Sequence, residues 1–410
     1  MTDHRGPIFP GRIAPVIAPL ALVAAFVLAQ PIGAANYTVD QRTGKKLTEA
    51  IELLQAEDYD GAGKILKSFN MGRLNSYEQA LVHQTSGYVA ASQENFAEAA
   101  KRFDAALALE ALPEGAQVST RFNLAQIYMM LERWDEAIAT FNKWFQEVET
   151  PNSLGYYMLA VAYYQSGDLD KAFAPATKAV ELASTPKEAW IRLLLALYME
   201  KKQYKEALPL VERLVSLYPK KPYWMQLSAI YAELGEDVKA LATQQLAYQG
   251  GFLTEDKELR RLAQMYLFHD LPYRAAEVLD KAIAEEQVAA DTKALELLGN
   301  SWLAAREYER ALEPLERAAE VSEDGELFLR LGRVYVQREE WDKAALELNK
   351  ALEKGNLEEP GNVHLLLGIA VYNQKRLDRA RRSFVRALEF EESNKNAQQW
   401  LRVIDRELES

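Results

Sequence analysis

Two stretches of this sequence repeat one another closely: residues 298–318 read LGNSWLAAREYERALEPLERA, and residues 331–351 read LGRVYVQREEWDKAALELNKA. Each begins with a Leu-Gly pair, passes through a polar turn, and resumes with an aromatic residue three positions before an alanine. Apolar and small residues follow that alanine at steps of four and seven, which place them on one stripe of an α-helix. Each stretch therefore predicts two antiparallel helices joined by a short turn.

The alanine of the second helix recurs along the chain, and we call its ten occurrences the register alanines. They are Ala62, Ala99, Ala137, Ala172, Ala207, Ala240, Ala275, Ala311, Ala344 and Ala380. The spacing between successive register alanines is typical of stacked helix pairs, in which each pair packs on its neighbours. The sequence thus predicts an all-α solenoid of about ten pairs over residues 41–390, followed by a C-terminal capping helix over residues 391–410.

These spacings resemble the tetratricopeptide repeat family. The pattern is carried by Leu298-Gly299, Trp302, Tyr308 and Ala311, and again by Leu331-Gly332, Tyr335, Trp341 and Ala344. The resemblance implies an array of paired helices whose first helices line a groove that binds other proteins.

Two pairs depart from the pattern. In the sixth, Gln244 replaces a bulky apolar residue, and in the seventh, Pro272 stands at the turn after an irregular connection over residues 248–253. We expect altered curvature or a contact surface there. Bends near residues 248–258 and 354–362 are open alternatives to one continuous superhelix.

Composition bears on the kind of partner and on chemistry. The formal net charge is −12, which disfavours phosphate backbones and hence nucleic acid as a partner. Cysteine is absent, so disulfides and thiolate metal sites are excluded. The four histidines lack ligand spacing and the acidic residues are scattered. We therefore predict no catalytic residues, no cofactor, no metal and no small-molecule substrate.

The first 35 residues have the layout of a secretory signal peptide. Arg5 and Arg12 precede an apolar run from Ile13 to Ala29, and Gly33-Ala34-Ala35 offers small residues before a cleavage point. We predict export to the periplasm. The alternative is an uncleaved segment that anchors the chain in the inner membrane.

A binding groove is predicted along the first helices of pairs two to five. Aromatic, Met, amide and Arg side chains lie there beside the core stripe, a combination suited to an extended or helical peptide. The residues are Gln84, Tyr88, Phe122, Gln126, Met129, Tyr157, Val161, Tyr164, Arg192 and Met199. The alternative is that they pack between neighbouring pairs. Replacing Tyr157 and Tyr164 by Ser separates the two, because a core role predicts loss of fold.

A second candidate surface is a basic cluster near the C-terminus. It contains Lys375, Arg376, Arg379, Arg381, Arg382 and Arg386, interrupted by Asp378. One interpretation is a solvated helix face balanced by nearby glutamates. The other is an electrostatic dock for an acidic partner or for lipid head groups.

Several stretches also resemble the tetratricopeptide component of TonB energy-transduction systems in Gram-negative bacteria. They are residues 221–231, 251–254, 262–266, 272–276 and 397–401. This resemblance implies a periplasmic accessory protein that works with TonB and the ExbB–ExbD motor complex in nutrient uptake. The alternative is an exported scaffold for envelope polysaccharide export or outer-membrane assembly.

Overall fold

The computed structural model describes residues 37–323 and 325–409. Within them the chain forms twenty-one α-helices and one short 3₁₀ helix, and no strand. The prediction of an all-α array of helix pairs is confirmed. The predicted signal peptide, residues 1–35, lies outside the described residues.

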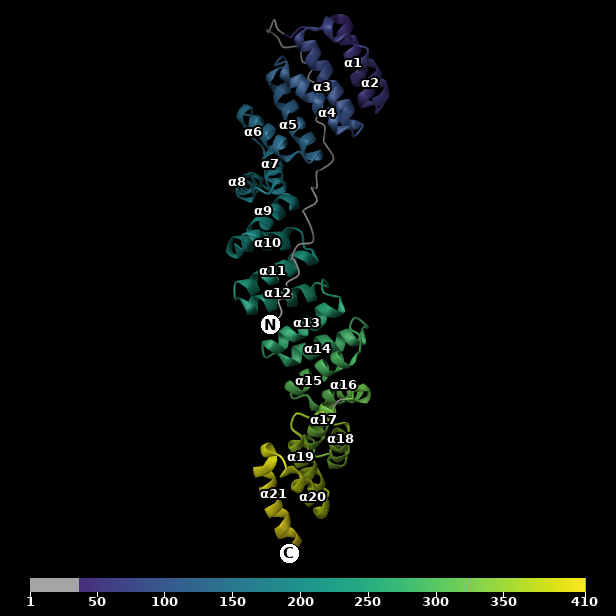
Figure 1. Ribbon diagram of the computed structural model, residues 1–410, viewed down its shortest axis with the longest axis vertical. Helices are drawn as coiled ribbons and strands as arrows, with labels where there is room; N and C mark the ends of the chain where they lie inside the picture. The colour runs from purple at the N-terminus through teal and green to yellow at the C-terminus, as the bar shows by residue number, and fades with distance from the viewer. Residues whose placement is uncertain (1–36, 324, 410) are drawn as a thin grey trace. The chain divides into compact units, whose positions relative to one another are not determined.

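The chain divides into two units between Pro219 and Lys220. In each unit, helices with odd numbers are the first helices of the pairs and helices with even numbers the second, except that α21 follows the last pair (Figure 1). The first unit contains α1 (Gln41–Gln55), α2 (Tyr59–Lys67), η1 (Met71–Arg73), α3 (Ser76–Ser92), α4 (Phe96–Ala108), α5 (Glu114–Met130), α6 (Trp134–Glu147), α7 (Ser153–Ser166), α8 (Leu169–Glu181), α9 (Glu188–Glu200) and α10 (Tyr204–Leu217).

The second unit continues the same alternation. It contains α11 (Lys221–Glu233), α12 (Asp237–Gln249), α13 (Asp256–Phe268), α14 (Pro272–Ala284), α15 (Thr292–Ala304), α16 (Tyr308–Val321), α17 (Gly325–Gln337), α18 (Trp341–Lys354), α19 (Pro360–Asn373), α20 (Leu377–Ala387) and α21 (Glu391–Glu409).

The register alanines form the centre of every pair, because each of the ten exposes at most 2% of its surface. A small residue on the first helix lets the two helices approach closely. A Cβ atom added to Gly332 would lie 2.6 Å from the side chain of Leu348, which stands four residues after its register alanine. The apolar pattern therefore sets both the helix periods and the distance between paired helices.

The turn within each pair has one conformation in all ten repeats. The residue five positions before the register alanine has a positive φ in every pair, although Gly stands there only at 167 and 235. The other eight residues are Glu57, Glu94, Glu132, Lys202, Asp270, Arg306, Glu339 and Lys375. A side chain at this φ is disfavoured, so helix packing must stabilise the turn where glycine is missing.

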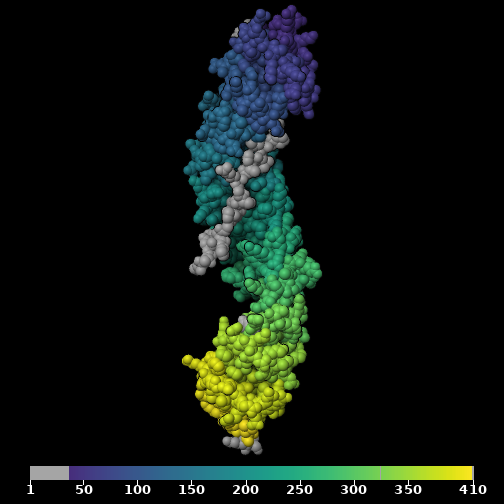
Figure 2. Space-filling view, turned by 45° about the vertical axis from the view of Figure 1, so that its right-hand side comes forward, coloured from purple at the N-terminus to yellow at the C-terminus, as the bar shows by residue number. Residues whose placement is uncertain are grey.

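The predicted capping segment is helical, as α21. Its buried residues include Ala397 and Ile404, and the ring of Trp400 stacks on that of Phe384 with centroids 5.4 Å apart. In the space-filling view, the yellow end of the second unit holds α19, α20 and α21 (Figure 2). α21 thus covers the apolar side of the last pair, as a terminal cap does in stacked arrays.

Candidate functional site

The ten residues of the predicted groove differ widely in exposure. Six of them expose only 2% to 8% of their surface: Gln84, Tyr88, Gln126, Met129, Tyr157 and Val161. Of the others, Phe122, Tyr164 and Met199 are half-buried and Arg192 is exposed. A partner could reach only these four without a rearrangement of the helices.

The buried groove residues contact neighbouring first helices. The amide Nε2 of Gln84 donates to Thr120 Oγ1 at 2.7 Å, and burial raises the pKa of Tyr88. The ring centroids of Tyr157 and Trp190 lie 5.9 Å apart, and burial raises the pKa of Tyr157 as well. This placement fits packing between neighbouring pairs. The prediction that these six side chains meet a partner is therefore not supported, and the groove stays a prediction for the four accessible ones.

Two first helices of the second unit, α13 and α17, expose positions that α3, α5, α7 and α9 of the first unit bury. Most first helices carry Gly or Ala where they approach the second helix of the pair, as at Gly332. The positions concerned lie two residues before this small residue and one residue after it. In α3, α5, α7 and α9 these residues expose at most 7%, and they are Thr85, Tyr88, Asn123, Gln126, Met158, Val161, Leu193 and Ala196. In α1 the corresponding Thr48 is exposed and Ile51 is half-buried. In α13 the corresponding Arg261 and Gln264 are exposed, and in α17 Arg330 is half-buried and Arg333 exposed.

These residues form a surface that we call the cationic face. It comprises Lys257, Arg261 and Gln264 of α13, Lys293 and Asn300 of α15, and Arg330 and Arg333 of α17. Within each helix its members are separated by three, four or seven residues and so share one side. Sequence reasoning missed this surface, although the cations recur at the same place in successive first helices.

Side-chain contacts join the three helices of the cationic face. Arg330 Nη1 donates to Asn300 Oδ1 at 3.3 Å and lies 3.8 Å from Glu296, so α17 and α15 are neighbours here. Arg260 Nη2 lies 2.9 Å from Asp291, which precedes α15, and also pairs with Asp256. The hydrogen bond to Asp256 is the main reason that the pKa of Arg260 is raised. This paired cation connects α13 to the start of α15.

Four cations of this face have no such partner. Lys257, Arg261, Lys293 and Arg333 form no ion pair with the carboxylates of residues 37–323 and 325–409. Their side chains are exposed and free to donate hydrogen bonds. In a chain with a formal charge of −12, this surface attracts carboxylates.

The second helix of the sixth pair, α12, buries polar side chains and exposes apolar ones. On α12 the polar residues Thr243 and Gln244 are buried, whereas Val238 and Leu246 expose 72% and 54% of their surfaces. Gln244 Nε2 reaches the sulfur of Met225 at 3.8 Å. At the departure predicted for Gln244, α12 thus buries two polar side chains beside Ala240, Leu241 and Ala247 and leaves two apolar ones exposed.

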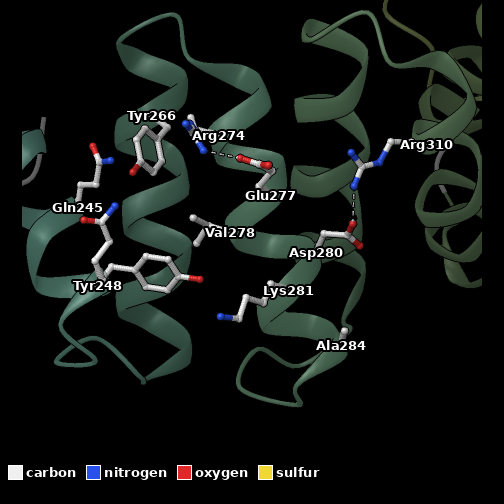
Figure 3. A pocket seen from close by; sticks show the side chains of 11 residues that line it. Gln245, Tyr248, Tyr266, Arg274, Glu277, Val278, Asp280, Lys281, Ala284 and Arg310 are labelled. Carbon is white, nitrogen blue, oxygen red and sulfur yellow. Dashed lines mark hydrogen bonds and ion pairs between the residues drawn. The ribbon is translucent and has the colours of Figure 1, made fainter.

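A hollow of about 540 Å³ lies beside α12, between α13, α14 and α16 (Figure 3). Tyr248 and Tyr266 form part of its wall. Its arginines are neutralised locally, because Arg274 pairs with Glu277 at 2.9 Å and Arg310 pairs with Asp280 at 3.0 Å. No histidine lines it, and the paired charges suit a protein contact better than acid–base chemistry.

The basic cluster predicted near the C-terminus begins in the turn before α20 and runs along that helix to its last turn. All six of its cations are exposed. Arg381 pairs with Asp405 of α21 at 2.8 Å, and Arg386 pairs with Glu389 at 2.9 Å. Lys375 lies over the ring of Tyr372. Arg379 and Arg382 form no ion pair within the described part of the chain.

Two features are absent from residues 37–323 and 325–409. They contain no group of three or more His, Asp or Glu side chains placed to hold a metal ion. They also contain no helix long and apolar enough to cross a membrane.

Comparison with known families gives one match. Residues 85–151, 157–222 and 329–397 match a family model described as a tetratricopeptide repeat. The first two segments lie in the first unit and the third in the second unit. No curated protein matches the sequence.

Several solved structures resemble parts of the chain at low sequence identity. A tetratricopeptide repeat protein from Parabacteroides merdae is 17% identical, with 64% of this chain and 99% of that chain covered and a TM-score of 0.40. The Cut9–Hcn1 hetero-tetramer of the APC/C is 16% identical, with coverages of 88% and 84% and a TM-score of 0.32. MamA is 23% identical, with coverages of 43% and 94% and a TM-score of 0.35.

Proposed function

We propose that this chain, about half of which matches a tetratricopeptide repeat model, is a scaffold that binds other proteins and performs no reaction itself. The observation that carries the proposal is the cationic face, where three successive first helices leave polar side chains exposed. Arg, Gln and Asn can donate hydrogen bonds to the carbonyl and carboxylate oxygens of a bound chain. A surface repeated along an array suits an extended partner segment.

The finer proposal is an exported accessory of a TonB energy-transduction system, with TonB or the ExbB–ExbD complex as partner. It is supported by the signal-peptide layout of residues 1–35 and by the resemblance of five stretches to that class of protein. All five stretches lie in the second unit, which also carries the cationic face. Uptake of iron or another nutrient is the process that such an accessory would serve.

In-cell photo-crosslinking tests this function. A photoreactive residue replaces Gln264, which is exposed on the cationic face, and a control chain carries it at Lys143, exposed on α6. We expect Gln264 to capture TonB, ExbB or ExbD and Lys143 to capture none. Recovery of polysaccharide-export or outer-membrane-assembly proteins would favour the alternative scaffold. Recovery of no TonB-system protein would refute the finer proposal.

Cell fractionation tests the proposed location. Cleavage after Ala35 predicts a chain that is released with the periplasmic contents and begins at Asn36. Recovery of the intact chain with the inner membrane would instead identify an uncleaved anchor.

A further inference from the structure

The repeats of the second unit serve as internal controls for α20. In all five second helices of the second unit, the residue before the register alanine is a cation. These cations are Lys239, Arg274, Arg310, Lys343 and Arg379. The first four are paired, with Glu236, Glu277, Asp280 and Glu340 respectively. Arg379 has no pair among the described residues.

Arg379 lacks an ion-pair partner because α20 has arginine at two positions where other second helices of this unit have glutamate. Four residues before the register alanine, Glu236, Glu307 and Glu340 occupy the place of Arg376. Two residues after it, Glu277 and Glu313 occupy the place of Arg382. α20 has therefore exchanged both carboxylate positions for cations.

This exchange is unfavourable for the helix itself. Arg379, Arg382 and Arg386 follow one another at steps of three and four, so like charges are neighbours on one side. Arg379 also lies in the first turn of α20, where the helix dipole disfavours cations. Arg376 lines a depression with Glu339, Glu340 and Asp342, but forms no ion pair with them. The charges of Arg379 and Arg382 thus remain uncompensated within the described chain.

We propose that Arg379 and Arg382, flanked by Arg376 and Arg386, form a docking site for an acidic segment of a partner protein. The inference rests on the proposed function as a protein-binding scaffold. It adds a second contact surface, on a second helix, and states the chemistry of what binds there. The paired cation Arg386 can exchange its exposed Glu389 partner for a carboxylate of the bound segment.

An acidic polypeptide fits this surface better than an anionic membrane. All four cations are arginines, whose planar guanidinium groups bind carboxylates through two parallel hydrogen bonds. Val385 is the one large apolar side chain of α20 that is prominently exposed, at 40%, so the described helix offers little to insert among lipids.

The test uses the full chain and a fluorescent peptide in which Glu and Ala alternate. α20 is roughly 16 Å long at 1.5 Å per residue, so about eight extended residues cover it with overlap. We expect Arg379→Gln with Arg382→Gln to weaken peptide binding by about tenfold or more. The matched control, Arg274→Gln with Arg317→Gln, removes two paired cations from α14 and α16 and should change binding less than about twofold.

A third variant guards against loss of fold. Arg382→Glu restores the carboxylate that α14 and α16 have at this place, so it should keep or raise the thermal midpoint while still weakening peptide binding. Equal loss of binding in the two double variants, or no peptide binding by the unaltered chain, would overturn the proposal. Arginine-dependent binding to phosphatidylglycerol vesicles without peptide binding would identify a membrane dock instead. Because crosslinking at Gln264 probes another surface, it can succeed when this test fails.

Discussion

The first helices of the two units share one repeat pattern and differ in what they leave exposed. In the first unit the residues beside the small position, such as Tyr88 and Val161, are buried against neighbouring helices. In the second unit the corresponding Gln264 and Arg333 are exposed. The register alanines are buried equally in both. The positions that build the pairs are therefore separable from the positions that decide what a first helix offers to a partner.

The sharpest way to break this comparison is to mutate one buried first-helix residue of the first unit and one exposed first-helix residue of the second unit. We expect Tyr157→Ser to lower the free energy of unfolding by about 3 kcal/mol, because it removes a buried ring packed near Trp190. Arg261→Gln should cost less than about 0.5 kcal/mol, since its side chain is exposed. Urea unfolding followed by helical circular dichroism measures both. A Tyr157→Ser chain of unchanged stability would return Tyr157 to the binding groove.

A glycine substitution tests the part that both units share. Gly332→Ala should destabilise the chain by about 1 to 3 kcal/mol, because the new Cβ would lie 2.6 Å from Leu348. Gly115→Ala in α5 is the control, as its Cβ meets no atom within 4 Å, and it should be neutral or stabilise by up to about 1 kcal/mol. Thermal melts of both variants give the result. Equal effects would mean that close helix approach does not limit this position.

Charge reversal on the cationic face tests its role in binding. We expect Arg261→Glu with Arg333→Glu to reduce crosslinking from Gln264 to the partner about tenfold, at little cost in stability. The control is Lys143→Glu with Lys205→Glu, which reverses two exposed cations of the first unit and the same total charge. If the control lowers crosslinking equally, net charge rather than this face governs recruitment.

The smallest expected effect concerns how stability depends on pH. One half-buried histidine in each unit contributes to it. Burial lowers the pKa of His83, helped by Arg102, and lowers that of His364, helped by Arg386 and opposed by Glu389. Because the unfolded chain then binds more protons, stability should fall as pH drops through the ordinary value near 6.5. His83→Gln should reduce this slope between about pH 7.5 and 5.5, as measured by urea unfolding. An unchanged slope would exclude a contribution from His83.

Much of the fold could be read from the sequence because paired helices depend on short-range periods. A buried stripe at steps of three, four and seven identifies the helices, and Gly299 or Gly332 marks a close approach. The shared turn conformation could not be read so easily, since Glu94 and Lys202 adopt a positive φ that glycine favours. Packing of the two flanking helices imposes it on them.

The candidate sites were only partly predictable. Aromatic and Met residues such as Tyr157 suggested a groove, but an apolar side chain on a first helix reads the same whether it meets a partner or a neighbouring helix. The cationic face was missed for the opposite reason. In the sequence, its charged residues look like ordinary solvated positions of a helix surface. The α20 cluster stood out by charge density, and the repeat register then showed which of its cations lack a carboxylate.

By itself the sequence determined the number of helix pairs, their registers and the capping segment. Each of these follows from side-chain periods along one helix, which the backbone geometry dictates. Only the tertiary structure decided which first-helix faces remain open and which cations are neutralised. Val161 is covered and Arg261 is not, and Arg310 meets Asp280 from the preceding pair. Exposure and pairing depend on distances between helices that are far apart in sequence, and no local pattern encodes those distances.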